Sequence, residues 1–137
     1  MPRKIWVNGT FDVIHLGHIR LLQYAASLGD VCVGLDTDRR IKQLKGENRP
    51  YNTLRERVEF LYALKSVKLV TSFDTDEELI EEIRRYAPDI MVIGEDYRNK
   101  HIIGSEFIPK IDFFQIVENK STTKILSHDK QNISDRT

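Results

Sequence analysis

The sequence has little cysteine and no long hydrophobic run. Its single cysteine, Cys32, permits no intrachain disulfide, a usage typical of a reducing compartment. Cys32 lies in the apolar run 31–33, so we expect a buried thiol with a raised pKa instead of a nucleophile. No segment reaches the roughly 20 apolar residues of a membrane helix, and the short apolar run after the start is too brief for a signal peptide. We therefore expect a cytoplasmic protein with no membrane partner.

An excess of charge of one sign is also missing. Lysine and arginine together number 21, as do aspartate and glutamate, so the formal net charge is zero. Because no overall field attracts polyanions, we expect no nucleic acid partner, and any anionic ligand must be held by local side chains. The 137 residues suffice for one hydrophobic core. We predict a single domain over residues 1–126, followed by a disordered polar tail over residues 127–137.

Apolar β-branched runs alternate along the chain with amphipathic stretches. The runs predict strands at 5–7, 31–35, 69–71, 90–93 and 113–117, and the amphipathic stretches predict helices at 18–28, 53–64, 77–86 and 122–126. Capping-box patterns at 53–56 and 75–78 support two of the helix starts. Strands separated by helices predict right-handed crossovers. The expected fold is therefore α/β, a Rossmann-like three-layer α/β/α sandwich with a mainly parallel five-stranded sheet.

The segment 9–18, Gly-Thr-Phe-Asp-Val-Ile-His-Leu-Gly-His, joins the first predicted strand to the first predicted helix. A helix start after a glycine-bearing turn offers N–H groups and the positive end of the helix dipole to a phosphate. Gly9 and Gly17 allow a ligand to approach the backbone closely. His15 and His18, three residues apart, share one face of the helix. Imidazoles beside a phosphate site predict chemistry at phosphorus.

Two simpler interpretations of the histidine pair are a metal half-site and a helix cap. A metal site would need further ligands, but His101 and His128 lie in no ligand-like cluster, so we predict none. A capping role alone leaves Gly9 and Gly17 unexplained. The phosphate-site interpretation is therefore favoured.

Segments that follow the other strands hold further candidates, because ligands of parallel sheets bind beyond the carboxyl ends of the strands. Lys45 and Arg57 would neutralise a triphosphate, although a solvated loop is the simpler interpretation of such cations. Gly94 would allow a turn over a planar base, with Asp96 and Tyr97 bonding to it or stacking on it.

Hydroxyl and carboxylate groups complete the set of candidates. Residues 121–123, Ser-Thr-Thr, precede the last predicted helix and could cap it or hold a second phosphate. Asp12, Asp36 and Asp38 could orient acceptor hydroxyls or help to hold Mg²⁺.

Two of these motifs resemble those of the cytidylyltransferase-like nucleotidyltransferases. Gly-Thr-Phe-Asp with His15-Leu-Gly-His18 is similar to the nucleotide motif of that family, and Ser-Thr-Thr-Lys-Ile at 121–125 is similar to its C-terminal motif. The resemblance covers residues 4–126. It implies that an acceptor phosphate oxygen attacks the α-phosphorus of a nucleoside triphosphate bound with Mg²⁺, and that pyrophosphate leaves. A homodimer is also expected from the family.

Two branches of the family compete. Residues 45–50, Lys-Gly-Glu-Asn-Arg-Pro, together with Asn52 and Gly94-x-Asp96-Tyr97, resemble the adenylyltransferase that makes ADP-heptose from a heptose 1-phosphate. That branch commonly has asparagine at Asp36 and lysine at Ile93. Glycerol-3-phosphate cytidylyltransferase shares the first motif and residues 121–125, but its Arg-Thr-Glu-Gly-Ile lead-in is replaced here by Ile-Val-Glu-Asn-Lys. We favour a sugar-phosphate adenylyltransferase, with the cytidylyltransferase and a non-catalytic nucleotide-binding module as alternatives.

The resemblance assigns a role to each candidate residue. The catalytic set is His15, His18, Lys45 and Arg57. The nucleotide-binding set adds Gly9, Thr10, Phe11, Gly17, Gly94, Asp96, Tyr97, Ser121, Thr122 and Thr123 to the two histidines. The acceptor-binding set is Asp12 and Asp38.

Overall fold

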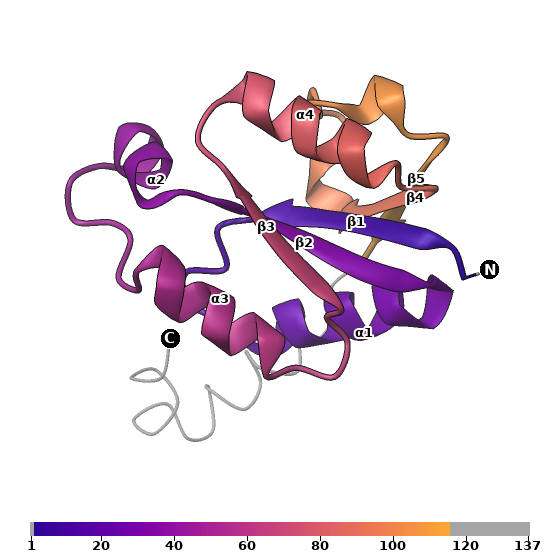
Figure 1. Ribbon diagram of the computed structural model, residues 1–137, viewed down its shortest axis with the longest axis horizontal. Helices are drawn as coiled ribbons and strands as arrows, with labels where there is room; N and C mark the ends of the chain where they lie inside the picture. Colours follow the sequence, from indigo (N-terminus) through magenta and orange to yellow (C-terminus); the bar gives the residue numbers. More distant parts are fainter. Residues whose placement is uncertain (1, 116–137) are drawn as a thin grey trace.

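Five strands form one sheet in the computed structural model, which describes residues 2–115 (Figure 1). All four strand pairings are parallel, and the strand order is β3-β2-β1-β4-β5. The sheet is therefore parallel throughout, and the predicted α/β sandwich is confirmed. The strands are β1 (Lys4–Gly9), β2 (Asp30–Asp36), β3 (Leu69–Phe73), β4 (Ile90–Gly94) and β5 (Lys110–Phe114).

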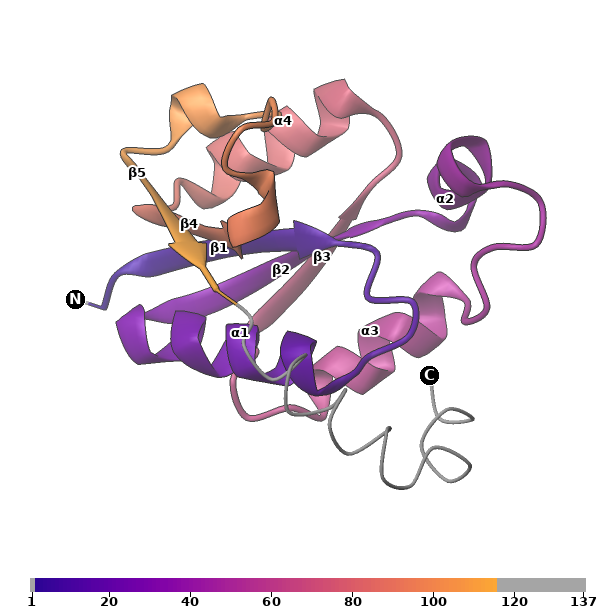
Figure 2. The same ribbon diagram turned by 180° about the vertical axis from the view of Figure 1, so that it is seen from behind.

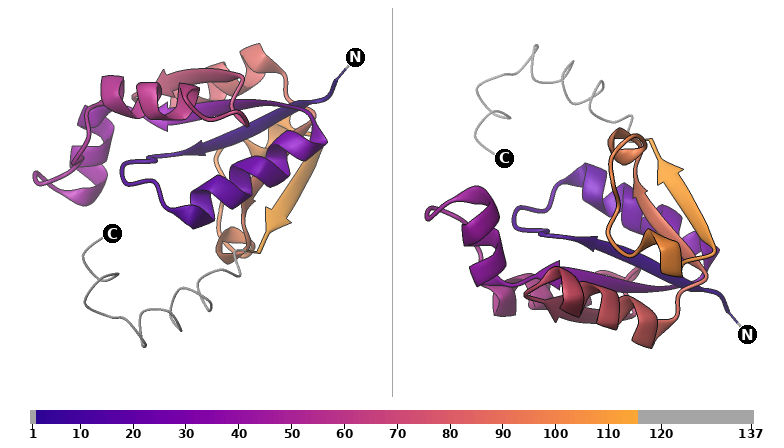
Figure 3. Two further views of the ribbon diagram at one scale, coloured as in Figure 1. Left: turned by 90° about the horizontal axis from the view of Figure 1, so that it is seen from below. Right: turned by 90° about the horizontal axis from the view of Figure 1, so that it is seen from above.

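Helices cover both faces of the sheet. The α-helices are α1 (Leu16–Leu28), α2 (Asp38–Lys45), α3 (Leu54–Tyr62) and α4 (Asp76–Tyr86), and two short 3₁₀ helices are η1 (Glu95–Tyr97) and η2 (Ser105–Phe107). Helices α1 and α3 lie on one face, whereas α4 and the 3₁₀ helices lie on the other (Figures 2 and 3). The chain passes from β3 back to β4 on this second face, as right-handed crossovers require. Within residues 2–115, no helix combines the length and apolarity needed to cross a membrane.

Alternate strand residues fill two separate cores. Ile5 and Val7 of β1 pack with α1 and α3, whereas Trp6 between them packs with α4. The other inner strands alternate in the same way, since side chains of a strand point to opposite faces in turn. Burial on both faces explains why these strands are continuous apolar runs in the sequence. Cys32 belongs to the second core with an exposed fraction of 1%, so its predicted burial is confirmed.

Gly34 of β2 makes room for the largest side chain of the second core. A Cβ atom at Gly34 would lie 2.5 Å from Cζ2 of the Trp6 indole. No real side chain could occupy this space without displacing the ring. The space left by Gly34 therefore determines where the Trp6 ring lies.

The main differences from the predicted elements concern α1, α2 and β5. Helix α1 begins at Leu16, two residues earlier than predicted, because His15 caps it. Helix α2 is not among the predicted helices: only Ile41 of its eight residues is buried, so no apolar stripe marks it in the sequence. Strand β5 begins at Lys110, three residues earlier than predicted. The predicted helix 122–126 and tail 127–137 lie outside the described residues.

The predicted capping boxes are confirmed at one helix and half-formed at another. Thr53 Oγ1 accepts the N–H of Glu56 at 3.2 Å, and Glu56 Oε1 accepts the N–H of Thr53 at 2.9 Å. Thr75 caps α4 in the same way, but the carboxylate of Glu78 accepts the N–H of Asp74 instead. Both helix starts are nevertheless fixed by local sequence.

Candidate active site

The candidate site lies at the carboxyl edge of the sheet, where the strand order reverses. The chain leaves β1 toward β2 and β3 on one side, and later reaches β4 and β5 on the other. Ligands of open parallel sheets bind at this switch point, outside the strand ends. The 10–15 loop, α2 and η1 follow β1, β2 and β4, and the loop and α2 project beyond this edge (Figures 1 and 2). The structure therefore brings together most of the segments that the sequence predicts.

His15 and His18 form a close pair of rings at the start of α1. Their ring centroids lie 4.0 Å apart, with 32° between the planes. Nδ1 of His15 accepts the N–H of Gly17 at 3.0 Å, and Nδ1 of His18 accepts the N–H of His15 at 3.1 Å. A ring nitrogen that accepts a hydrogen bond carries no proton, so each neutral imidazole has its proton on Nε2. Both rings therefore present an Nε2–H donor on the side away from the helix backbone.

Burial, reinforced by the neighbouring His15, lowers the pKa of His18 to about 4. At neutral pH the ring is therefore uncharged, and its Nε2–H can donate a hydrogen bond. This arrangement changes the predicted role of the helix start. The N–H groups of His15 and Gly17 are bonded to the imidazoles, so these two backbone donors are already occupied.

The buried Phe11 ring packs against His18 and offers little surface to a ligand. Its ring centroid lies 5.1 Å from that of His18, and only 5% of the residue is exposed. Its φ of 47° places it in the left-handed region, which is uncommon for a residue with a side chain. The conformation turns the chain sharply after Gly9 and Thr10. The structure thus favours a positioning role for the Phe11 side chain over the predicted nucleotide contact.

Asp12 does not face an acceptor, contrary to the sequence-based expectation. The residue is 2% exposed, and its carboxylate accepts the N–H groups of Tyr51 and Asn52, both at 2.8 Å, and Nε of Arg49 at 3.1 Å. Burial opposes ionisation, but the hydrogen bonds of Asn52, Tyr51 and Arg49 outweigh it and hold the pKa of the Asp12 carboxyl below its ordinary value. Both oxygens of this carboxylate accept hydrogen bonds from the 49–52 segment, and these bonds hold the segment against the histidine motif. Asp12 is therefore a positioning residue.

Arg57 is also buried, with no exposed surface, so it cannot touch the phosphates as predicted. Its guanidinium donates to the carbonyl oxygens of Thr10 at 3.0 Å, Asp36 at 2.8 Å and Asn52 at 3.1 Å, and to the carboxylate of Asp38 at 2.7 Å. These acceptors follow β1, end β2, precede α3 and begin α2, respectively. One planar cation therefore joins four segments of the candidate site.

The remaining cations lie at the surface of the site. Lys45 is exposed at the last turn of α2 and is followed by Gly46 in the left-handed region. Arg49 is partly exposed and its Cζ lies 4.7 Å from the ring centroid of Tyr51. Arg49 is absent from the predicted site residues, although its place in the basic 45–50 loop was a usable signal. Asp38 remains partly exposed while it is bonded to Arg57.

The segment after β4 has the predicted turn. A Cβ atom at Gly94 would lie 2.7 Å from Oδ1 of Asp96, so the absence of a side chain lets Asp96 fold back over the strand end. Tyr97 is 45% exposed, and Nζ of Lys100 lies 5.0 Å from its ring centroid. Both side chains remain open to a ligand. The other predicted phosphate segment, Ser121, Thr122 and Thr123, lies outside the described residues.

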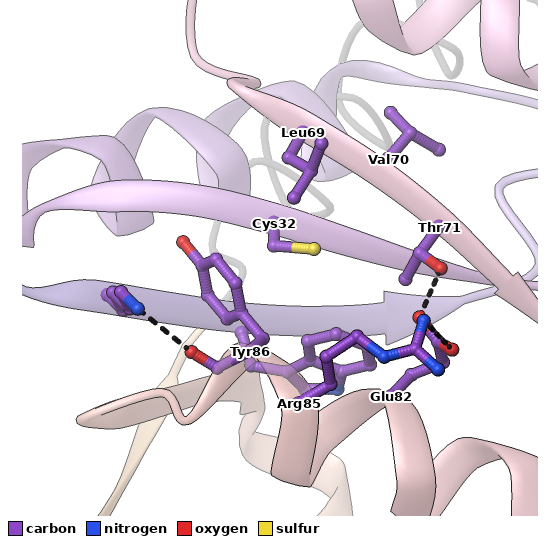
Figure 4. A pocket seen from close by; sticks show the side chains of 9 residues that line it. Cys32, Leu69, Val70, Thr71, Glu82, Arg85 and Tyr86 are labelled. Carbon is purple, nitrogen blue, oxygen red and sulfur yellow. Dashed lines mark hydrogen bonds and ion pairs between the residues drawn. The ribbon is translucent and has the colours of Figure 1, made fainter.

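A separate cavity of about 340 Å³ opens at the opposite end of the sheet, between β3 and α4 (Figure 4). Its polar side chains bond to one another: Thr71 Oγ1 donates to Glu82 at 2.6 Å, and Arg85 pairs with the same carboxylate at 3.1 Å. Burial, with a contribution from Glu82, raises the pKa of the Cys32 thiol in its wall to about 12. This cavity offers no convergent group for chemistry, and it lies away from the switch point.

Among residues 2–115, no cluster of three or more histidine, cysteine, aspartate or glutamate side chains could hold a metal ion. Magnesium in phosphoryl-transfer sites is usually held by one or two carboxylates together with substrate phosphates. The exposed or partly exposed carboxylates at this edge, Asp38 and Asp96, are therefore compatible with Mg²⁺ that is bound mainly by the phosphates of a nucleotide.

Sequence comparisons match nearly the whole chain. The family model described as cytidylyltransferase-like matches residues 6–133. The bifunctional protein HldE of Campylobacter fetus subsp. fetus is 44% identical over 124 residues, covering 90% of this chain and 27% of that protein. HldE of Nitratiruptor sp. is 42% identical over 127 residues, again covering 90% of this chain and 27% of that protein. The chain thus spans about a quarter of the length of these curated relatives.

Solved structures share the fold. The lipopolysaccharide core biosynthesis protein of Thermoplasma volcanium superposes with a TM-score of 0.66 at 22% identity, covering 85% of this chain and 98% of that one. The pantothenate synthetase of Thermus thermophilus superposes with a TM-score of 0.56 at 15% identity, covering 83% and 55%. At these identities the likeness concerns the fold alone.

Proposed function

Since this chain belongs to the cytidylyltransferase-like family of nucleotidyltransferases, we propose that it transfers an adenylyl group from ATP to a sugar 1-phosphate, with heptose 1-phosphate as the favoured acceptor. A phosphate oxygen of the acceptor attacks the α-phosphorus of ATP, and the bond to the β-phosphate oxygen breaks. The products are ADP-sugar and pyrophosphate. The acceptor supplies the nucleophile, so none is required from the protein.

The pair of histidine rings carries this proposal. Catalysis without a protein nucleophile depends on positioning and on donors aimed at the oxygens where charge develops. His15 and His18 each keep an Nε2–H free for this purpose because Nδ1 of each ring is bonded to the backbone. Since burial lowers the pKa of His18 to about 4, this ring remains a neutral donor across the physiological range.

Cations and Mg²⁺ complete the proposed phosphate site. Arg49 belongs to the 49–52 segment that Asp12 binds to the histidine motif, and Lys45 ends α2 just before this segment. Their charge, together with Mg²⁺ carried by the triphosphate, would neutralise the phosphates and the leaving pyrophosphate. Gly94, Asp96 and Tyr97 would border the base, and Thr10 with residues 121–123 would contribute hydroxyl groups.

The basic loop favours ATP and a sugar phosphate over CTP and glycerol 3-phosphate. Residues 45–50, Lys-Gly-Glu-Asn-Arg-Pro, are those that resemble the ADP-heptose-forming branch, and Asp12 holds Arg49 of this loop at 3.1 Å. Glycerol-3-phosphate cytidylyltransferase is the second candidate because it shares the first motif and residues 121–125. A nucleotide-binding module without catalysis is the non-enzymatic alternative.

Pyrophosphate release tests the proposal. ATP and CTP would each be supplied with Mg²⁺ and with heptose 1-phosphate, other sugar 1-phosphates or glycerol 3-phosphate. We expect turnover with ATP and a sugar 1-phosphate, and a loss of roughly a hundredfold in kcat for His18→Asn, in which the amide oxygen can still accept the N–H of His15. Turnover only with CTP and glycerol 3-phosphate would support the second candidate. Tight nucleotide binding without turnover on any acceptor would contradict the enzymatic assignment.

A further inference from the structure

We propose that a small hollow at the same edge of the sheet binds the hydroxyl-bearing carbon skeleton of the acceptor, and that Asn8 and Asp36 select it. The inference rests on the proposed function, which supplies the acceptor phosphate. The hollow has a volume of about 150 Å³ and lies on the α4 face of the sheet. Its polar lining consists of Asn8, Asp36, Arg40, Tyr97 and His101.

Asn8 is oriented by the buried Trp6. The indole Nε1–H of Trp6 donates to Oδ1 of Asn8 at 2.8 Å, and Trp6 itself has no exposed surface. Because an indole nitrogen only donates, this bond determines which end of the amide is the oxygen. The NH₂ group of Asn8 therefore lies on the side away from the indole, and it has no hydrogen-bond partner among residues 2–115. It is a fixed donor at the end of β1.

Asp36 provides the matching acceptor at the end of β2. The residue is 8% exposed, and its Oδ1 accepts Nε of Arg40 at 2.8 Å. Its Oδ2 has no partner within the described part of the chain. Asn8 pairs in register with Gly34, two residues before Asp36, and alternation places both side chains on the α4 face. A sugar hydroxyl both donates and accepts, so a neighbouring carboxylate and amide suit it.

The charges of the hollow exclude the phosphate as its occupant. Arg40 pairs with Asp36 and also with Asp76, each at 2.8 Å, so its positive charge is fully balanced by two carboxylates. Apolar side chains, among them Phe73 and Leu79, form the rest of the wall. A neutral to acidic hollow with an apolar wall fits the C–H and O–H groups of a sugar, while the phosphate of the same molecule remains at the histidine edge.

Steady-state kinetics on the full chain test this assignment. Asp36→Ala removes a charged hydrogen-bond acceptor, so we expect the acceptor KM to rise about tenfold to a hundredfold while the ATP KM stays unchanged. Asp76→Ala is the matched control: it removes the other carboxylate partner of Arg40, but Asp76 is not part of the hollow. We expect both KM values of this control to stay within about twofold of the wild type.

Acceptor analogues that each lack one hydroxyl separate recognition from structural damage. In the wild type, loss of the hydroxyl that meets Asp36 should raise the acceptor KM, and in Asp36→Ala the same loss should have little further effect. An unchanged acceptor KM in Asp36→Ala would overturn the assignment. An equal effect of Asp76→Ala would do the same. A rise in the ATP KM in place of the acceptor KM would also overturn it, and would place the base in the hollow.

Trp6 offers a readout that needs no turnover. The chain has one tryptophan, so an ¹⁵N–¹H spectrum contains a single indole N–H signal. We expect mannose 1-phosphate to shift this signal and inorganic phosphate to leave it in place, because only the sugar reaches the partner of the indole. A shift in a protein that shows no turnover would support the hollow and contradict the proposed reaction. Turnover with an unmoved indole signal and an Asp36→Ala variant of normal acceptor KM would support the proposed reaction and contradict the hollow.

Discussion

Replacing Arg57 with lysine tests whether this residue acts by joining loops or by touching phosphate. The guanidinium makes four hydrogen bonds, to three backbone carbonyls and to the carboxylate of Asp38, and it has no exposed surface. A lysine ammonium keeps the charge but donates from one atom instead of a planar fork. Nη1 donates to both the Thr10 and the Asp36 carbonyl, whereas Nε and Nη2 donate to Asn52 and Asp38. Because a single ammonium cannot reach all these acceptors, we expect lysine to lose about two of the four bonds.

The cost follows from the acceptors that are left behind. Each buried carbonyl without a donor costs about 1–3 kcal/mol, so two of them lower the free energy of unfolding by about 2–6 kcal/mol. A domain of this size has roughly 5–15 kcal/mol of stability, so most of this range leaves a folded protein. With a urea m-value of about 1.5 kcal/mol/M, a loss of 3 kcal/mol moves the unfolding midpoint by about 2 M. The loops after β1 and β2 should then shift, lowering kcat/KM by at least about tenfold.

The assay compares urea unfolding with kinetics in two variants. Arg57→Lys should lose stability and activity together. Arg55→Lys is the matched control, because Arg55 lies two residues earlier on the exposed side of α3, and neither property should change. A folded Arg57→Lys protein with wild-type stability and lost activity would refute the reasoning, because it would show that the guanidinium meets the ligand directly.

Three further predictions concern single side chains. Lys45→Ala should raise the ATP KM about tenfold, since an exposed cation at the phosphate site is lost, whereas Lys42→Ala, one turn earlier on α2, should not. The pKa of His18 is lowered from 6.5 to about 4, so the neutral ring contributes its full stability above pH 6.5, and this contribution is lost as the pH falls toward 4. Urea unfolding should show a loss of about 1–2 kcal/mol over this pH range, a figure reduced to allow for the partial exposure of the ring. His18→Asn should abolish this pH dependence. Burial raises the pKa of Cys32 to about 12, so the native thiol should resist alkylation at pH 8 when followed by mass spectrometry, and rapid labelling would contradict its burial. Cys32→Ser should cost about 1–3 kcal/mol of stability without changing KM.

The strands and the histidine motif could be predicted because their signals are local. Ile5 and Val7 belong to an apolar run that is buried on both faces, and the spacing of His15 and His18 is visible in the sequence itself. Helix α2 escaped prediction because it buries Ile41 alone, and its Thr37 cap resembles an ordinary turn residue. A short polar helix at the edge of a site depends on tertiary contacts that periodicity does not record.

The roles of Asp12 and Arg57 also depend on distant partners. Asp12 meets donors 37 to 40 residues away in the sequence, and Arg57 meets the carbonyl of Thr10 across 47 residues. Residue type and motif position predicted ligand contacts for both side chains, but only the folded chain shows that their polar atoms are already occupied. Charged residues in a motif can therefore bind the loops that carry the chemistry instead of the ligand.

A ³¹P NMR spectrum of the wild-type reaction tests the central claim most directly. The sample would contain the full chain, ATP, Mg²⁺ and heptose 1-phosphate. Attack at the α-phosphorus predicts the growth of one pyrophosphate signal together with the two coupled signals of an ADP-sugar, in equal amounts and without AMP. The appearance of AMP, of ADP with inorganic phosphate, or of no new signal from a protein that binds ATP would contradict the account.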